Sequence, residues 1–147
     1  MADTSGQNYA NHRQFVVLYH VVLFGLITVT LIGACVNLAQ SWGDHGRIYS
    51  ASLIVALAVA VLLLFSLTRI FALKVQDRAI RAEEQLRHYV LTGKLLDTRL
   101  TVKQIVGLRF ASDEELAVLA KRAADQGLTP DAIKREIKNW RADTYRA

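Results

Sequence analysis

The chain has 147 residues, of which 52% are hydrophobic, and its 18 Lys and Arg against 13 Asp and Glu give a formal net charge of +5. A single cysteine, Cys35, excludes a disulfide within the chain and a metal site built from several thiolates. The apolar residues concentrate between Phe15 and Leu73, whereas the second half has the composition of a soluble helical segment; this asymmetry is typical of a membrane protein with a water-soluble tail.

Two long apolar runs follow a short N-terminal segment, residues 1–14. The first run, 15–39, has 25 residues and the second, 48–68, has 21, and neither contains Asp, Glu, Lys or Arg. A helix of about 20 residues crosses a hydrocarbon core of roughly 30 Å, in which the backbone must satisfy its own hydrogen bonds. We therefore predict an all-α membrane protein with transmembrane helices over 15–39 and 48–73, joined by an external turn over 40–47.

The placement of basic residues predicts the orientation of this hairpin. The turn carries only Arg47, whereas five basic residues follow the second run: Arg69, Lys74, Arg78, Arg81 and Arg87. The positive-inside rule then places both termini in the cytoplasm. We expect the first four of these residues to contact anionic lipid headgroups, each contributing on the order of 1 kcal/mol.

Two residues of the first run leave alternatives open. His20 is an ionisable group in an apolar run and is able to ligate haem or a metal, but no second ligand set accompanies it, so an interfacial or helix-bonding histidine is the favoured interpretation. Ile32-Gly33-Ala34-Cys35 resembles a lipoprotein lipobox, in which Cys35 would be acylated. The apolar stretch before Cys35 is longer than a signal-peptide core of about 7–15 residues, which favours a buried structural cysteine.

Small residues recur every four positions in both runs and indicate helix packing, because they let helix backbones approach closely. The residues concerned are Thr30, Ala34, Ser52, Ala56 and Ala60. They serve either to join the two spans to each other or to join the hairpin to a partner. Neither run contains proline or a relay of charged residues, so the pattern does not favour a transporter or channel.

The second helix is expected to continue into a cytoplasmic stalk over 74–91, since no Gly or Pro interrupts it. A heptad-like stripe with spacings of 4, 3, 4 and 3 predicts an interaction face for the tail: Val75, Ala79, Ala82, Leu86 and Tyr89. Two repeats leave a coiled coil and packing against the chain's own tail as open alternatives. Asp77 with Arg81, and Glu83 with Arg87, have the i,i+4 spacing of helix-supporting ion pairs.

The remaining segment, 92–147, predicts a cytoplasmic mini-bundle of three short helices. Thr101 with Gln104, and Ser112 with Glu115, have the spacing of capping boxes. Gly127 ends the second helix, Thr129-Pro130 opens the third, and Ile133, Ile137 and Trp140 form the apolar stripe of that third helix. From Lys74 onward the chain has 15 basic and 11 acidic residues, a net charge of +4. Because these charges are interspersed, a solvated surface is favoured over a nucleic-acid interface.

Three segments carry a resemblance to a known family: Gln7–Arg13, Ala72–Glu84 and Leu108–Glu115. On these residues the chain resembles an uncharacterised bacterial family of small two-span membrane proteins, catalogued as a domain of unknown function, over nearly its whole length. The resemblance implies a bacterial inner-membrane location and the topology derived above. It brings no activity, cofactor or catalytic residue.

The sequence predicts a non-catalytic structural or accessory subunit of a larger inner-membrane complex, with respiratory and photosynthetic complexes as the candidate classes. It contains no nucleotide-binding glycine loop, paired metal-ligand motif or nucleophile elbow, and we expect no cofactor. The expected partners are the lipid bilayer and other membrane subunits. Three alternatives stay open: a homo-oligomeric membrane scaffold, a haem- or metal-binding protein using His20, and a membrane-tethered regulator whose basic tail binds anionic lipid or nucleic acid.

Overall fold

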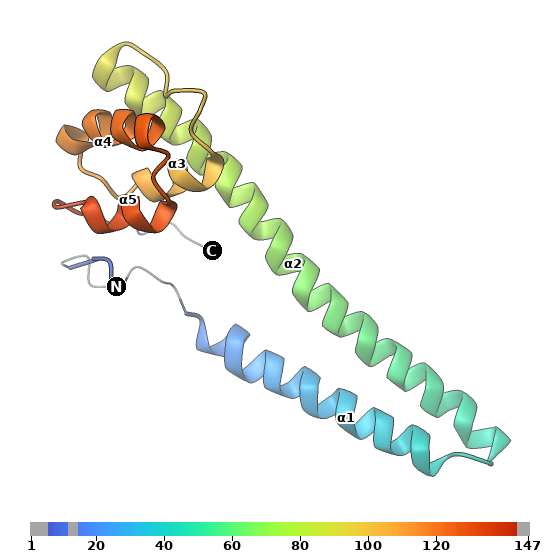
Figure 1. Cartoon of the computed structure of the whole chain (residues 1–147). Helices are drawn as coiled ribbons and strands as arrows, with labels where there is room; N and C mark the ends of the chain where they lie inside the picture. The colour runs from blue at the N-terminus through green and yellow to red at the C-terminus, as the bar shows by residue number, and fades with distance from the viewer. Residues whose placement is uncertain (1–5, 12–14, 144–147) are drawn as a thin grey trace. The chain divides into compact units, whose positions relative to one another are not determined.

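The computed structural model describes residues 6–11 and 15–143, and within these ranges it is all-helical, as predicted (Figure 1). The elements in chain order are a π-helix η1 (Leu18–Leu23), α1 (Phe24–Gln40), α2 (His45–Thr92), α3 (Val102–Leu108), α4 (Asp113–Gln126) and α5 (Pro130–Glu136). The chain divides into two compact units, a hairpin unit (Phe15–Phe71) and a tail unit (Met1–Gln14 with Ala72–Ala147). Parts of the predicted N-terminal segment 1–14, among them Arg13, and residues 144–147 lie outside the described ranges.

The hairpin unit contains two helices that are long and apolar enough to cross a membrane. One runs over Leu18–Gln40, and the other is the apolar part of α2. The first helix opens as a π-helix, a wider form that usually occupies a single turn. There the hydroxyl of Tyr19 donates to the backbone carbonyl of Phe65 at 2.8 Å, and the two rings stack with centroids 4.3 Å apart. This contact fixes the open end of the hairpin.

The connection between α1 and α2 is four residues long, 41–44, and so is tighter than the predicted turn over 40–47. The hydroxyl of Ser41 donates to the carbonyl of Asn37 at 2.8 Å. The Asp44 carboxylate accepts from two backbone N–H groups in the first turn of α2, at 3.0 and 3.3 Å. The Asp44 carboxylate thus pairs N–H groups at the start of α2, where a helix leaves N–H groups without partners inside the helix, and this lets the chain reverse over few residues.

Helix α2 is a single helix of 48 residues. The predicted span over 48–73 and the predicted stalk over 74–91 are therefore parts of one element, consistent with the absence of Gly and Pro between Ile48 and Thr92. Its N-terminal part belongs to the hairpin unit, and its C-terminal part, from Ala72, belongs to the tail unit.

The tail unit has its own apolar core, formed by α3, α4, α5 and their connections. The fully buried members with the largest side chains are Ile105, Leu108, Phe110, Leu116 and Ile133. Helices α3 and α5 approach closely at Gly107, where a Cβ atom would lie 3.3 Å from the carbonyl oxygen of Pro130. Glycine at this position therefore allows the two helices to pack backbone to backbone.

The helix boundaries of the tail agree with the sequence signals, with two corrections. Thr101 and Gln104 form the predicted capping box, Gly127 ends α4 with a left-handed φ of 62°, and Thr129 caps α5. Ser112 precedes α4 as predicted, but its hydroxyl makes no capping bond. The Glu115 carboxylate instead accepts from the backbone N–H groups of residues 138 and 139.

The second correction concerns the end of the third helix. Helix α5 stops at Glu136, so Trp140 does not continue the predicted helical stripe. The chain is extended here and pairs with Ala111 in an isolated β-bridge, and the backbone N–H of Arg141 donates to the carbonyl of Phe110 at 2.8 Å. The Trp140 ring then packs on the ring of Phe110, with centroids 5.0 Å apart. Backbone pairing places this tryptophan on the core.

The two caps provide a test of local stability. Thr101→Ala removes a hydroxyl that accepts from the Gln104 N–H and should lower the opening free energy of α3 by about 1 kcal/mol. Ser112→Ala removes a hydroxyl without a capping bond and should change the opening of α4 much less. Hydrogen exchange of the intact chain in detergent measures both. Equal losses of protection in the two variants would contradict the assignment of a capping bond to Thr101 and of none to Ser112.

Candidate functional site

The predicted packing residues of the hairpin divide into an inner and an outer set. Ala34 of α1 is buried, together with Ile27, and faces a seam to which α2 contributes Ala51 and Ala58. The other predicted residues are exposed in the single chain: Thr30, Ser52, Ala56 and Ala60. The exposure of Ser52, Ala56 and Ala60 leaves packing against a partner available to them, whereas Thr30 lines a groove between the two helices of the hairpin. Sequence spacing alone did not separate Ala51 and Ala58 from their exposed neighbours.

Cys35 is exposed rather than buried, so the expectation of a buried structural cysteine is wrong for the single chain. An open apolar groove of about 270 Å³ lies between the two helices of the hairpin unit. Its lining includes Ile27 and Thr30 from α1 and Leu57 and Ala58 from α2, with almost no polar surface. The groove has the chemistry of a surface that hydrocarbon or another apolar helix covers.

His20 lies in the π-helix, and its Nδ1 atom is 3.0 Å from the carbonyl oxygen of Val16. Its ring stacks on Phe15 with centroids 4.8 Å apart. Within the described residues no group of three or more His, Cys, Asp or Glu side chains is placed to hold a metal ion. The contacts of His20 are therefore those of a histidine that bonds to its own helix.

The four predicted headgroup-binding residues fall into two environments. Arg69 is half-buried, with its guanidinium carbon 5.9 Å from the centroid of the Tyr19 ring, a cation–π arrangement. Lys74, Arg78 and Arg81 are exposed, and none of them has an ion pair to a residue in the described ranges. These three side chains are available to anions.

The stalk part of α2 has a tail-facing side and a free side. Ile80 and Glu84 are buried on the tail-facing side, and Arg87 and Gln85 also contact the tail from this part of the helix. The predicted interaction stripe is on the other side and is exposed at all five positions: Val75, Ala79, Ala82, Leu86 and Tyr89. Within the described residues, the stripe therefore does not pack against the chain's own tail in the single chain.

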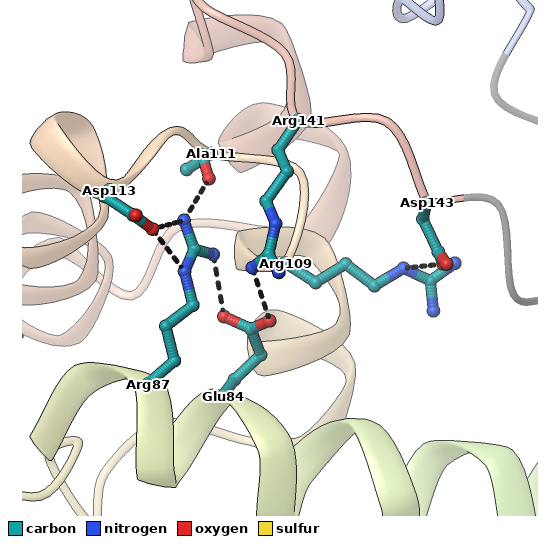
Figure 2. A network of polar contacts seen from close by, with 7 residues as sticks. All are labelled: Glu84, Arg87, Arg109, Ala111, Asp113, Arg141 and Asp143. Atoms are coloured by element: carbon teal, nitrogen blue, oxygen red, sulfur yellow. Dashed lines mark hydrogen bonds and ion pairs between the residues drawn. The ribbon is translucent and has the colours of Figure 1, made fainter. Parts of the chain in front are cut away.

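A network of ion pairs holds the tail-facing side of α2 to the segment between α3 and α4 (Figure 2). The Arg87 guanidinium donates to the carbonyl of Ala111 at 2.7 Å, to Asp113 at 2.7 Å and to Glu84 at 3.0 Å. The side chains of Arg87 and Glu84 are only 11% and 6% exposed. Arg141 approaches the other oxygen of Glu84, at 3.9 Å. Buried charges of this kind are stable only when each is paired.

The sequence indicated a different ion pair for Arg87. The expected i,i+4 partner was Glu83, whereas the observed partner is Glu84 at i,i+3. Glu83 is exposed, while Glu84 is on the buried side with Ile80. Ile80 and Glu84 are four residues apart and therefore lie on the same side of the helix, and this spacing was the available signal. The sequence does not show that the Glu84 carboxylate is buried, because its burial depends on where the tail packs.

A polar pocket of about 380 Å³ opens beside this network. Its charged lining consists of Glu83, Glu84, Arg109, Arg141 and Asp143. The Arg109 Nε atom is 3.1 Å from a carboxylate oxygen of Asp143, as Figure 2 shows. Both signs of charge are present in this lining: Glu84 and Asp143 are paired with arginines, whereas Glu83 has no ion pair to a residue in the described ranges.

The N-terminal segment contacts the tail through Tyr9. Its hydroxyl donates to Asp131 at 2.7 Å and accepts from the Nε of Arg135 at 3.2 Å, and its ring lies beneath the Arg135 guanidinium. The hydrogen bond from Tyr9, with the positive charge of Arg135, holds the pKa of Asp131 below its usual value. A second contact runs from the backbone N–H of Asp143 to the Gln7 side chain at 2.7 Å. Residues 6–11 are thus part of the tail unit.

Comparison with known proteins gives one match. A family model described as a family of unknown function (DUF6526) matches residues 1–147, so the chain belongs to that family. No curated protein and no solved structure matches the chain.

The buried network gives a prediction about the tail. Arg87→Met should destabilise the tail unit by about 3 kcal/mol, because it leaves Glu84 buried with only the more distant Arg141. Arg87→Met with Glu84→Leu should recover most of that loss, since the uncompensated charge is gone. Hydrogen exchange of α3 and α4 in the intact chain measures the effect.

The matched control is Arg99→Met, which breaks the exposed pairs of Arg99 with Asp97 and Asp125 and should change little. A double variant as unstable as Arg87→Met would show that packing, rather than the unpaired carboxylate, causes the loss.

Proposed function

We propose that this member of the DUF6526 family is a non-catalytic structural or accessory subunit of a larger bacterial inner-membrane complex, acting through helix packing. The observation that carries the proposal is the contrast between its two units. The tail unit has a buried core and internally paired charges, whereas the hairpin unit exposes most of its large apolar side chains. A hairpin with such a surface needs lipid and helices around it.

The contact between Tyr9 and Asp131 supports the proposed topology. The segment before the hairpin and the tail after it meet through a hydrogen bond, and two segments that touch must lie on the same side of a membrane. Two crossings between them satisfy this requirement. The basic residues after the second helix favour the cytoplasm for that side.

The exposed small residues support packing against a partner within the membrane. Ser52, Ala56 and Ala60 form a stripe on α2 that the hairpin itself does not cover. Between apolar helices, small side chains allow close van der Waals contact, which is the main source of association in lipid. The complexes that we consider first are respiratory and photosynthetic ones, whose many spanning helices offer such neighbours.

A second candidate is a membrane-tethered protein whose tail binds anionic lipid. The specific observation that favours it is the exposure of Lys74, Arg78 and Arg81, none of which has an ion pair within residues 6–11 and 15–143. Strongly salt-dependent binding of the full chain to vesicles containing anionic lipid, and weak binding to neutral vesicles, would favour this candidate.

Topology can be tested by labelling single cysteines in a Cys35→Ser background. Trp42→Cys, at a position that is 80% exposed in the external turn, should react with an impermeant maleimide in intact spheroplasts. Lys121→Cys, on an exposed position of α4, should react only after permeabilisation. The reverse pattern would invert the orientation, and reaction of both positions in intact cells would contradict the hairpin.

Membrane packing can be tested by enlarging the small stripe. Ala56→Leu should reduce the recovery of co-purifying membrane subunits after gentle detergent extraction, because the added side chain keeps the helices apart. Ala39→Leu, at another exposed alanine on the opposite side of the first helix from Thr30, is the matched control and should leave recovery unchanged. Equal recovery with both variants would count against the stripe as a packing face.

A further inference from the structure

We infer that the free side of the stalk pairs with the same side of a second copy of this chain, in a parallel two-stranded coiled coil. The parallel orientation rests on the membrane placement proposed above. Two copies inserted with the same orientation carry their α2 helices out of the membrane in the same direction.

The inference starts from the spacing of the exposed stripe. Val75, Ala79, Ala82, Leu86 and Tyr89 occupy alternating d and a positions of a heptad, d-a-d-a-d. Val75 and Leu86 are apolar, yet their side chains are 67% and 64% exposed in the single chain. Ala79 and Ala82 lie between the larger residues and let two such helices approach closely at the centre.

The tail contacts the stalk mainly away from this seam. In the same heptad Ile80 and Arg87 take b positions and Glu84 takes an f position. Gln85, at a g position beside the seam, also contacts the tail, because its side chain accepts a hydrogen bond from the backbone N–H of Leu96 at 3.1 Å. The b and f positions face away from the a/d seam of a coiled coil. A second copy is therefore able to use the stripe while each tail stays bound to its own helix.

Charge complementarity identifies the occupant as a second copy. Arg78 takes the g position of one heptad, and Glu83 takes the e position of the next. In a parallel dimer a g residue lies beside the following e residue of the partner helix, so the assembly forms two symmetric Arg78–Glu83 pairs. Both side chains are exposed, and neither has an ion pair to a residue in the described part of the chain.

The seam is short, and membrane attachment compensates for its length. From Val75 to Tyr89 it spans about 21 Å, or two heptads, which is marginal for two free helices in water. Two helices anchored in one membrane meet at a high effective concentration, so a weak seam is enough to pair them.

Disulfide formation between full-length chains in native membranes tests the inference. In a Cys35→Ser background, Ala82→Cys and Leu86→Cys place the thiols of two copies face to face, and mild oxidation should give a covalent dimer of twice the chain mass. Arg81→Cys, an exposed c position one residue away, is the matched control. We expect a dimer yield at least about tenfold higher at the two seam positions than at the control. The reason is that the Cα atoms of residue 81 in the two copies lie farther apart than a disulfide allows.

Charge reversal at positions beside the seam adds a second readout. Arg78→Glu should reduce the Ala82→Cys dimer yield several-fold, since it places like charges beside each other across the seam. Arg78→Glu together with Glu83→Arg should restore the yield. Failure of the double reversal to restore it would overturn the pairing of these residues.

The remaining outcomes are also decisive. Equal yields at seam and control positions, or an adduct whose mass shows a different protein at Ala82→Cys, would overturn the second copy as occupant. If the chain remained in the soluble fraction without detergent, the proposed function would fail, whereas seam-specific dimers in that fraction would still support the pairing of two copies. Membrane-inserted chains without seam dimers would overturn the inference and leave the proposed function intact.

Discussion

The continuity of α2 is the constraint on which the rest of the structure depends. One helix of 48 residues, about 72 Å long, carries an apolar half in the hairpin unit and a charged half in the tail unit. In the apolar half, backbone groups are satisfied inside the helix, so the side chains are free to be uniformly apolar. In the charged half the same backbone presents two sides of different character, and the buried Glu84–Arg87 pair determines which of them the tail occupies.

Most of the architecture could be predicted from the sequence because its signals are local. Two uncharged runs, a stretch without Gly or Pro, and the capping residues Thr101, Gly127 and Thr129 each specify a helix or its end from a few neighbouring residues. The all-α class, the hairpin helices and the three tail helices follow from them. Ser112 shows where local reasoning stops, since the carboxylate three residues later bonds to a distant part of the chain.

The interaction surfaces were harder to predict because they depend on which side of a helix another element covers. The apolar stripe from Val75 to Tyr89 was visible in the sequence, but its exposure was not, and the buried side with Glu84 was hidden by its charge. Likewise, spacing identified alanines in the second span but not which of them face the first helix. Contacts between residues far apart in sequence, such as that of Tyr9 with Asp131, have no local signal at all.

The π-helix at the start of the hairpin has a consequence for how this chain tolerates change in length. A π-turn holds about one residue more than an α-turn, so removing one residue from Leu18–Leu23 would allow an ordinary α-helix to form there. Because one turn of either helix is a full revolution, the side chains before and after the deletion would keep about the same directions around the helix axis. Tyr19 would therefore still point toward Phe65 if the residue removed followed it in the turn. This turn is thus a place where the chain can lose one residue without changing the direction of its aromatic side chains.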